Sequence, residues 1–348
     1  MAISSRRVFI KTGAALAAMP GIVAGARVTA PSYSTSQSNR QEFEKLSSSK
    51  APWKPVRVLD TDRMPWVKAP TTDPEKYAAA RKVLFENPET KGALVLTFRA
   101  AGWGGAPVHY HTFHEWGYML SGDSTNNEST HPKQHYGPLM RFREGYYLDR
   151  PPYSLHGGER GRQDFMRSQS GASWFFMEEQ DVWSGTYSVE PQVSYYNPDY
   201  KKVKQWTVPR IIDTIGGMPF EPDPDVPGLH FKYLTFDQTT GFRVMLYRLE
   251  PEWNSSRSPQ FARAYYYKQG YQFTFVLAGD LNIQTYQAPG QKAEKITLGR
   301  YSYVERAPMS IFGLADGVVT QIGCYWLEAT YGKGATHSST PIEDPNYI

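Results

Sequence analysis

The sequence predicts an all-β protein made of two similar halves, each a sandwich or barrel of the jelly-roll kind. Its 348 residues include 26 prolines, 29 glycines and 24 tyrosines, a composition that favours short strands separated by many turns. Short apolar segments such as 93–98 and 243–249 are rich in β-branched and aromatic residues, as strands are. A hydrophobic content of 40% is enough to build one large or two ordinary domains.

Four blocks of sequence occur twice, in the same order along the chain. Segments 58–66, 83–103, 115–123 and 149–157 match segments 211–220, 233–253, 272–280 and 305–313. This order indicates that the two halves arose by duplication. The one helix that the sequence predicts is short. It covers 74–85, because Asp73 and Pro74 provide a cap and a first-turn proline.

The first 26 residues have the three parts of an export signal. Arg6 and Arg7 form a twin-arginine pattern, a weakly apolar stretch follows, and Ala24–Ala26 suits signal peptidase. We therefore expect the twin-arginine translocase as a partner during export, and a periplasmic or secreted mature protein. A membrane anchor is the weaker reading, because the apolar stretch 12–23 is too short to span a bilayer.

The charge balance gives little indication of macromolecular partners. Cleavage after residue 26 removes three basic residues and no acid, so Lys+Arg falls from 38 to 35 against 34 Asp+Glu. The sequence contains no basic cluster for nucleic acid and no basic amphipathic helix for a membrane surface. Cys324 is the single cysteine, so an intramolecular disulfide is excluded.

Six of the eight histidines lie between positions 109 and 156. His109 and His111 would project to the same face of a strand and could both reach one ion. Glu115 is an even number of residues away from both histidines, so on a continuous strand it would project to the same face. His156 follows a proline turn that could return the chain on a neighbouring strand. Three imidazoles and one carboxylate leave open positions on a six-coordinate ion, where a substrate oxygen or dioxygen could bind.

The remaining features between these positions predict no ligands. His114, His131 and His135 are expected in loops or at the surface. The polar segment 124–140 is expected to be a plain loop, with a lid over the barrel mouth as the alternative. Trp103 and Met119 are candidates for the pocket wall, since Met119 shares the parity of Glu115.

Segments 109–122 (HYHTFHEWGYMLSG) and 145–156 (GYYLDRPPYSLH) resemble the two motifs of the cupin superfamily. Three positions depart from those motifs: Gly104 stands one residue too close to the histidines, Tyr153 replaces a glycine and Arg160 replaces an asparagine. The resemblance implies two tandem cupin domains, a bicupin. It also implies that His109, His111, Glu115 and His156 are the metal ligands.

Aligned in the same way, the second half has no such ligand set. Counting back from Gly279 places Tyr266, Lys268 and Gln272 opposite the first three ligands, and Phe312 opposite the fourth. We therefore expect one transition metal ion per chain and a second pocket filled by aromatic side chains. Iron or manganese is preferred because a protein exported in the folded state can take up its ion in the cytoplasm; copper, nickel and zinc also occur in cupins.

The resemblance implies a fold and a metal more than a reaction. The first hypothesis is a metal-dependent oxidoreductase, a dioxygenase acting on a small organic substrate in the periplasm. A decarboxylase or lyase of the oxalate decarboxylase type is the second, and a non-catalytic binding protein with a structural metal is the third. A homo-oligomer is possible and the sequence does not decide it.

These observations predict the organisation of the chain, as follows: residues 1–26 a signal peptide, 27–55 a linker, 56–205 a first domain with the metal site, 206–335 a second domain without metal ligands, and 336–348 a polar tail.

Overall fold

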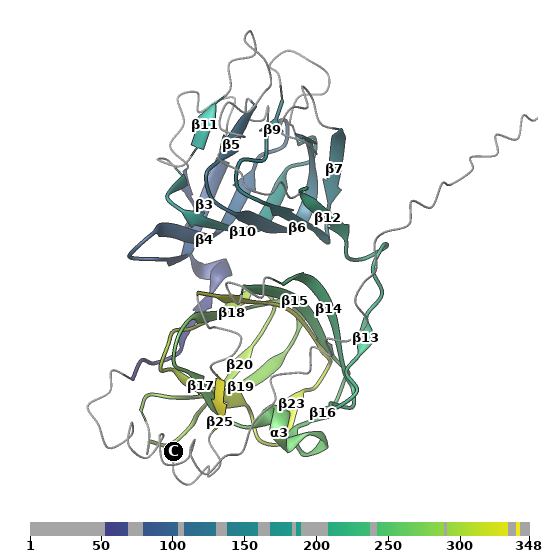
Figure 1. Cartoon of the computed structure of the whole chain (residues 1–348). Coiled ribbons are helices and arrows are strands. Elements are labelled where there is room, and N and C mark those ends of the chain that lie inside the picture. Colours follow the sequence, from purple (N-terminus) through teal and green to yellow (C-terminus); the bar gives the residue numbers. More distant parts are fainter. Residues whose placement is uncertain are drawn as a thin grey trace, which may run out of the picture. The chain divides into compact units, whose positions relative to one another are not determined.

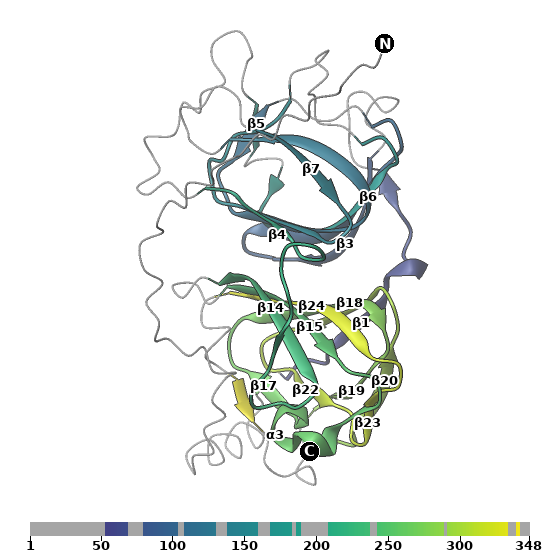
Figure 2. The same cartoon turned by 90° about the vertical axis from the view of Figure 1, so that its right-hand side faces the viewer.

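The computed structural model shows an almost entirely β protein with two barrels (Figures 1 and 2). The structure describes residues 53–68, 79–103, 108–129, 138–158, 168–182, 186–188, 208–236, 242–288, 291–332 and 339–341. The helical elements whose full bounds are described are the 3-10 turns η1 (Thr61–Arg63) and η3 (Ser255–Arg257) and the short α3 (Pro259–Ala262). No helix in these ranges is long and apolar enough to cross a membrane. The predicted signal peptide, with Arg6 and Arg7, lies outside them.

The first barrel is an antiparallel arrangement centred on one long strand, β6. Its strands are β2 (Val67–Lys68), β3 (Ala79–Glu86), β4 (Lys91–Arg99), β5 (His109–His111), β6 (Glu115–Glu128), β7 (Leu139–Arg143), β8 (Tyr146–Arg150), β9 (His156–Gly157), β10 (Ala172–Gln180) and β11 (Thr186–Ser188). The hydrogen-bonded order is β11-β5-β9-β6-β10-β4-β3-β2, and β7 and β8 also pair with β6. Strand β6 therefore connects the histidine-bearing strands to the rest of the barrel.

The second barrel repeats this plan. Its strands are β13 (Glu221–Pro222), β14 (Leu229–Phe236), β15 (Arg243–Leu249), β16 (Trp253–Asn254), β17 (Tyr265–Tyr267), β18 (Tyr271–Gly279), β19 (Leu281–Tyr286), β20 (Glu294–Leu298), β21 (Ser302–Arg306), β22 (Ile311–Leu314), β23 (Val318–Thr320), β24 (Cys324–Tyr331) and β25 (Ser339–Pro341). Two of its sheets have the orders β21-β18-β24-β15-β14-β13 and β20-β19-β22-β17-β25.

Each half gives its leading strand to the other barrel. Strand β1 (Arg57–Asp60) pairs with β21 of the second barrel, and β12 (Arg210–Asp213) pairs with β8 of the first. The predicted domain boundaries at 56 and 206 therefore follow the order of the sequence but not the sheets. Strand β25 likewise lies within the segment 336–348 that was expected to be a polar tail, and it pairs with β17.

The backbone repeats at the positions where the sequence blocks match. Gly122 and Gly279 have φ angles of 82° and 83°, and a Cβ on either would lie within 2 Å of a carbonyl oxygen of the neighbouring strand connection. Tyr153 and Met309 both have a φ of 67°, a left-handed conformation that favours glycine. Tyr153, which stands where the second cupin motif has a glycine, therefore keeps the backbone conformation that the glycine would adopt.

The predicted helix over 74–85 is wrong in the part that the structure describes, because Ala79–Glu86 is strand β3. This strand pairs with β2 on one side and with β4 on the other. Leu84 and Phe85 are buried in the largest apolar cluster. Burial and cross-strand pairing outweigh the helix propensity of the alanines, as tertiary context often does.

The largest apolar cluster contains side chains from both barrels. Phe175 of β10 and Phe275 of β18 lie with ring centroids 4.7 Å apart, and both are fully buried. Trp116 of β6 belongs to the same cluster. Successive side chains of a strand point to opposite faces of the sheet. Because Trp116 faces the apolar cluster, its neighbour Glu115 faces the inside of the first barrel.

Candidate metal centre

Three histidines converge inside the first barrel. His109 and His111 lie two residues apart on β5, and His109 is the cross-strand partner of His156 on β9. Ring nitrogens of all three lie within 4.8 Å of one another. The three rings have centroid separations of 4.1, 5.0 and 5.1 Å. In the part of the chain that the structure describes, this is the one group of three or more potential ligands that converges in this way.

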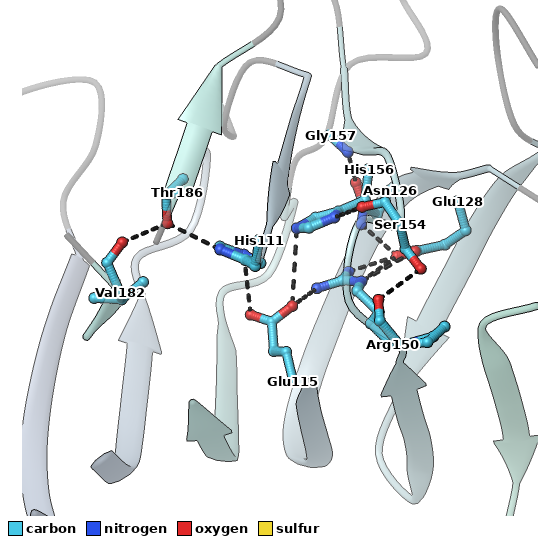
Figure 3. Close-up of polar contacts among 11 residues, drawn as sticks. His111, Glu115, Asn126, Glu128, Arg150, Ser154, His156, Gly157, Val182 and Thr186 are labelled. Atoms are coloured by element: carbon cyan, nitrogen blue, oxygen red, sulfur yellow. Dashed lines mark hydrogen bonds and ion pairs between the residues drawn. The ribbon is translucent and has the colours of Figure 1, made fainter. Parts of the chain in front are cut away.

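Hydrogen bonds fix the tautomers of two of these rings (Figure 3). The Nδ1 of His156 lies 3.0 Å from the carbonyl oxygen of Ser154, which only accepts, so Nδ1 carries the proton. The Nδ1 of His111 lies 2.9 Å from the hydroxyl of Thr186, which itself donates to the carbonyl of Val182. Nδ1 therefore donates in both rings, and each Nε2 presents a lone pair.

The surroundings also keep these imidazoles neutral. Burial, and then the charge of Arg150, lower the pKa of His156 well below its usual range. Burial lowers the pKa of His111, and the opposing charge of Glu115 only partly offsets it. Neutral rings with an oriented lone pair are the form that binds a transition metal. The described residues therefore fit such an ion by the chemistry of their donors.

Glu115 lies at the start of β6, beside two of the three histidines (Figure 3). Its Oε1 is 3.6 Å from Nε2 of His111, and its Oε2 is 3.8 Å from Nε2 of His156. The same Oε2 accepts a hydrogen bond of 2.6 Å from Nη1 of Arg150. Burial alone would raise the pKa of Glu115, but the charge and hydrogen bond of Arg150 and the nearby histidines together outweigh it, and this pKa lies below its usual range. The carboxylate is therefore an anion and a weak base.

Arg150 connects this carboxylate to a second one that the sequence did not reveal. Its Nε lies 3.0 Å from Oε2 of Glu128, and its Nη2 donates to the other oxygen of Glu128. Asn126 donates to Glu128 and accepts a hydrogen bond of 2.9 Å from the backbone N–H of Gly157, beside His156. This buried network joins β8 to β6 and β9, two of the strands that carry the proposed ligands.

Two members of the network, Asn126 and Glu128, lie in the segment 124–140 that the sequence predicts to be a loop. Residues 124–128 continue strand β6 and 139–143 form β7, while 130–137 lie outside the described residues. The signal in the sequence was the alternation of Ser124, Asn126 and Glu128, which puts three polar side chains on one face of a strand. Arg150 also stands inside the duplicated block, where Arg306 is its counterpart.

A cavity of about 100 Å³ opens beside the histidines. Its wall is formed by Arg99, Trp103, His109, Glu115, Ser124, Asn126, Phe142, Leu148, Arg150, His156, Trp174 and Phe176. Trp103 therefore lies in the pocket wall. Met119 is fully buried and packs with Leu148 in an apolar cluster of the first barrel, outside this wall.

His114 lies in the loop between β5 and β6, as the sequence predicts, but it is half-buried and paired with two acids. Its Nδ1 lies 3.0 Å from Glu179, and its Nε2 contacts Asp149. Burial alone would lower the pKa of His114, but the hydrogen bonds and charges of Asp149 and Glu179 raise it to about 10. His114 is therefore a charged structural link. His131 and His135 lie outside the described residues.

Solved structures with a similar arrangement share little sequence with this chain. A candidate dioxygenase from Nostoc punctiforme matches with a TM-score of 0.58 and 12% identity, covering 84% of this chain and 88% of that one. The coconut allergen cocosin matches with a TM-score of 0.51 and 7% identity, covering 82% and 87%. Oxalate decarboxylase from Bacillus subtilis matches with a TM-score of 0.46 and 12% identity, covering 73% and 72%. No family model and no curated protein sequence matches the chain.

The chain has the fold of two tandem cupin domains. This confirms the predicted fold class, and identities this low show the fold alone. The first cupin domain carries the histidine cluster. The second contains the duplicated blocks but different side chains at the corresponding positions.

The structure shifts the predicted correspondence in the second cupin domain by one residue. Tyr265, not Tyr266, pairs across strands with Phe312, as His109 pairs with His156. The backbone N–H of Met309 bonds to the carbonyl of Tyr267, as that of Tyr153 bonds to His111. Tyr265 and Tyr267 are therefore the counterparts of His109 and His111, and Lys268 is exposed. The reason is one extra residue between Tyr267 and Gln272, compared with the spacing of His111 and Glu115.

Aromatic rings stand where the first domain has imidazoles. Tyr265 and Phe312 have centroids 4.1 Å apart, the same separation as His109 and His156. Gln272 takes the place of Glu115, and Nη1 of Arg306 donates to it at 3.1 Å. The arginine contact is kept although the charge of its partner is lost.

Proposed function

We propose that this chain is a metal-dependent enzyme acting on a small organic substrate, an oxidoreductase of the dioxygenase kind. The proposed ligands of its one transition metal ion are His109, His111, His156 and Glu115, with iron or manganese preferred. The observation that carries the proposal is the convergence of three imidazoles with two fixed Nε2 lone pairs at the wall of a cavity. A structural zinc site would instead be closed by four tetrahedral ligands.

The residues around the proposed ion would have distinct roles. When bound, the ion would supply a Lewis-acid or redox centre for a substrate oxygen. Thr186 and Ser154 hold two imidazoles in the binding tautomer. Arg150 keeps Glu115 ionised, so that its charge offsets that of the ion. The apolar part of the wall, including Phe176, would exclude water.

A metal-dependent decarboxylase or lyase is the second candidate. Arg99 in the cavity wall favours it, since a buried guanidinium suits a carboxylate-bearing substrate. The two candidates differ in what they consume and release. A dioxygenase consumes oxygen in proportion to substrate, whereas a decarboxylase releases carbon dioxide without net oxygen uptake.

The test begins with metal analysis of protein purified from its native compartment, followed by oxygen-uptake and carbon-dioxide assays on a panel of small organic compounds. We expect about one metal ion per chain and metal-dependent turnover. His111→Ala should lose metal and activity together, and His230→Ala in the second domain is the matched control. Azide or nitric oxide should perturb the spectrum of the metal. A site silent to every such ligand, in a protein without metal-dependent turnover, would favour the non-catalytic binding protein.

We also propose that the chain is exported to the periplasm by the twin-arginine route. The support is the sequence of the first 26 residues. Arg6→Lys/Arg7→Lys should leave precursor in the cytoplasm, while Arg27→Lys, just beyond the expected cleavage point, should not. Unchanged periplasmic accumulation in a strain lacking the translocase would contradict this route.

A further inference from the structure

One side of the cavity wall carries hydrogen-bond donors that have no acceptor among the residues that the structure describes. Arg99 is the last residue of β4, and its guanidinium carbon lies 4.2 Å from the ring centroid of Trp103. Among the described residues, its guanidinium makes this stacking contact and no hydrogen bond or ion pair. In contrast, Arg150, which borders the same cavity, is held by two carboxylates.

Two indole groups in this wall share the same property. Trp103 and Trp174 are 7% and 3% exposed, so neither indole is open to bulk solvent. The Nε1 of each is buried and has no hydrogen-bond partner in the described part of the chain. A buried N–H without an acceptor costs about 1–3 kcal/mol, so such a group calls for an explanation. Both residues border the cavity together with Arg99.

The charges around the cavity favour an anion as the missing acceptor. Arg99 and Arg150 carry two positive charges, and Glu115 and Glu128 carry at most two negative ones. His111 and His156, whose tautomers are fixed by hydrogen bonds, add no positive charge as neutral rings. A divalent ion at the histidines would leave the site with a positive excess, in surroundings where an unpaired charge is costly.

We propose that Arg99, Trp103 and Trp174 form an anion-binding wall that takes the carboxylate group of a small organic acid. This inference rests on the proposed function, whose substrate it assigns to the class of small carboxylates. The guanidinium would donate two parallel hydrogen bonds to the carboxylate, and the indole N–H groups would supply further donors. The cavity is well below the roughly 300–1,000 Å³ of sites for drug-sized ligands, so the acid is small.

The test uses acetate, with acetamide as the neutral isostere, and follows binding by calorimetry and tryptophan fluorescence. Metal-free full-length protein is titrated first, and metal content is measured separately. We expect acetate, and not acetamide, to bind the wild-type protein. Arg99→Gln should weaken acetate binding by roughly 10- to 100-fold, the size of a lost charged hydrogen bond. Arg141→Gln, at an exposed position on β7, is the control.

Two further variants keep the test decisive if Arg99→Gln fails to fold. Trp103→Phe and Trp174→Phe keep an aromatic ring but remove the N–H, and each should weaken acetate binding severalfold. Equal binding of acetate and acetamide, or acetate binding unchanged in all the folded wall variants, would overturn the anion-binding wall. Absence of metal from a protein that still discriminates acetate from acetamide would instead overturn the proposed enzyme and leave the wall standing.

Discussion

Nη1 of Arg150 lies 2.6 Å from Oε2 of Glu115, and both side chains are buried beside the three histidines. The same guanidinium contacts both oxygens of Glu128. A proposed metal ligand is thus part of an ion-pair network that ties β6 to β8. The network and the metal centre should respond together when either is changed.

Replacing Arg150 with methionine should destabilise the protein strongly. Removing the cation leaves Glu115 and Glu128 buried without their counter-charge, and breaking a buried pair in this way costs about 3–5 kcal/mol. Urea unfolding of the metal-free protein measures this cost. Arg141→Met, at an exposed position of β7, should change stability by less than about 0.5 kcal/mol. Equal effects of the two substitutions would contradict the role of the network.

Replacing Glu115 with glutamine should leave metal content nearly intact while reducing turnover by roughly a hundredfold or more, the size typical of losing a general base. Three imidazoles remain to hold the ion, and the amide oxygen can still accept from Arg150. The Arg150 contact lowers the pKa of Glu115 and makes it a weak base, so this variant is a demanding test of a proton-accepting role. Glu144→Gln in the β7–β8 turn is the control. If the variant loses metal in parallel with activity, Glu115 acts only as a metal ligand and not as a general base.

Replacing Thr186 with valine should weaken metal binding by about 10- to 100-fold, the usual effect of losing a residue that orients a ligand. The variant keeps the shape of the side chain but removes the oxygen that accepts from Nδ1 of His111. Competition with a chelator measures the affinity. Thr297→Val, an exposed change in the second domain, should have no effect. Unchanged affinity in Thr186→Val would show that the tautomer of His111 is set in another way.

The charge on His114 predicts a pH dependence of stability. The pKa of His114 is raised to about 10 in the folded protein, against about 6.5 in an unfolded chain. The folded state therefore holds a proton between these values that the unfolded state lacks. Its contribution, on the order of 5 kcal/mol, is full below pH ~6.5 and is lost as pH rises toward 10. Urea unfolding of metal-free protein at pH 6, 8 and 9.5 should show this slope in the wild type and a smaller one in His114→Gln.

The sequence predicts the fold well because its main signals are local or repeated. Alternation, turns and four duplicated blocks identify two β domains without any knowledge of contacts. The helix over 74–85 fails because the burial of Leu84 and Phe85 depends on strands distant in sequence. The exchange of β1 and β12 between the barrels could not be predicted either, because their partner strands β21 and β8 are distant in sequence.

For the candidate site too, the features that depend on local sequence could be predicted, and those that depend on distant residues could not. The spacing of His109 and His111 on one strand is local, so its geometry follows from the sequence. The partners of Glu115 are not local, because Arg150 lies 35 residues away. Tyr265, not Tyr266, is the counterpart of His109 because the second half has one inserted residue. Counting back from Gly279 along the sequence does not reveal this insertion, so it assigns the counterpart one residue too late.

The central claim is that the first cupin domain holds the one metal ion of the chain at His109, His111 and His156. The most direct measurement is the metal content of purified full-length protein and of a His109→Ala/His156→Ala variant, with Tyr265→Phe as the matched change in the second domain. We predict about one transition metal ion per chain in the wild type and in Tyr265→Phe, and none in the double variant. Two tightly bound ions per chain, or metal retained by the double variant, would contradict the claim.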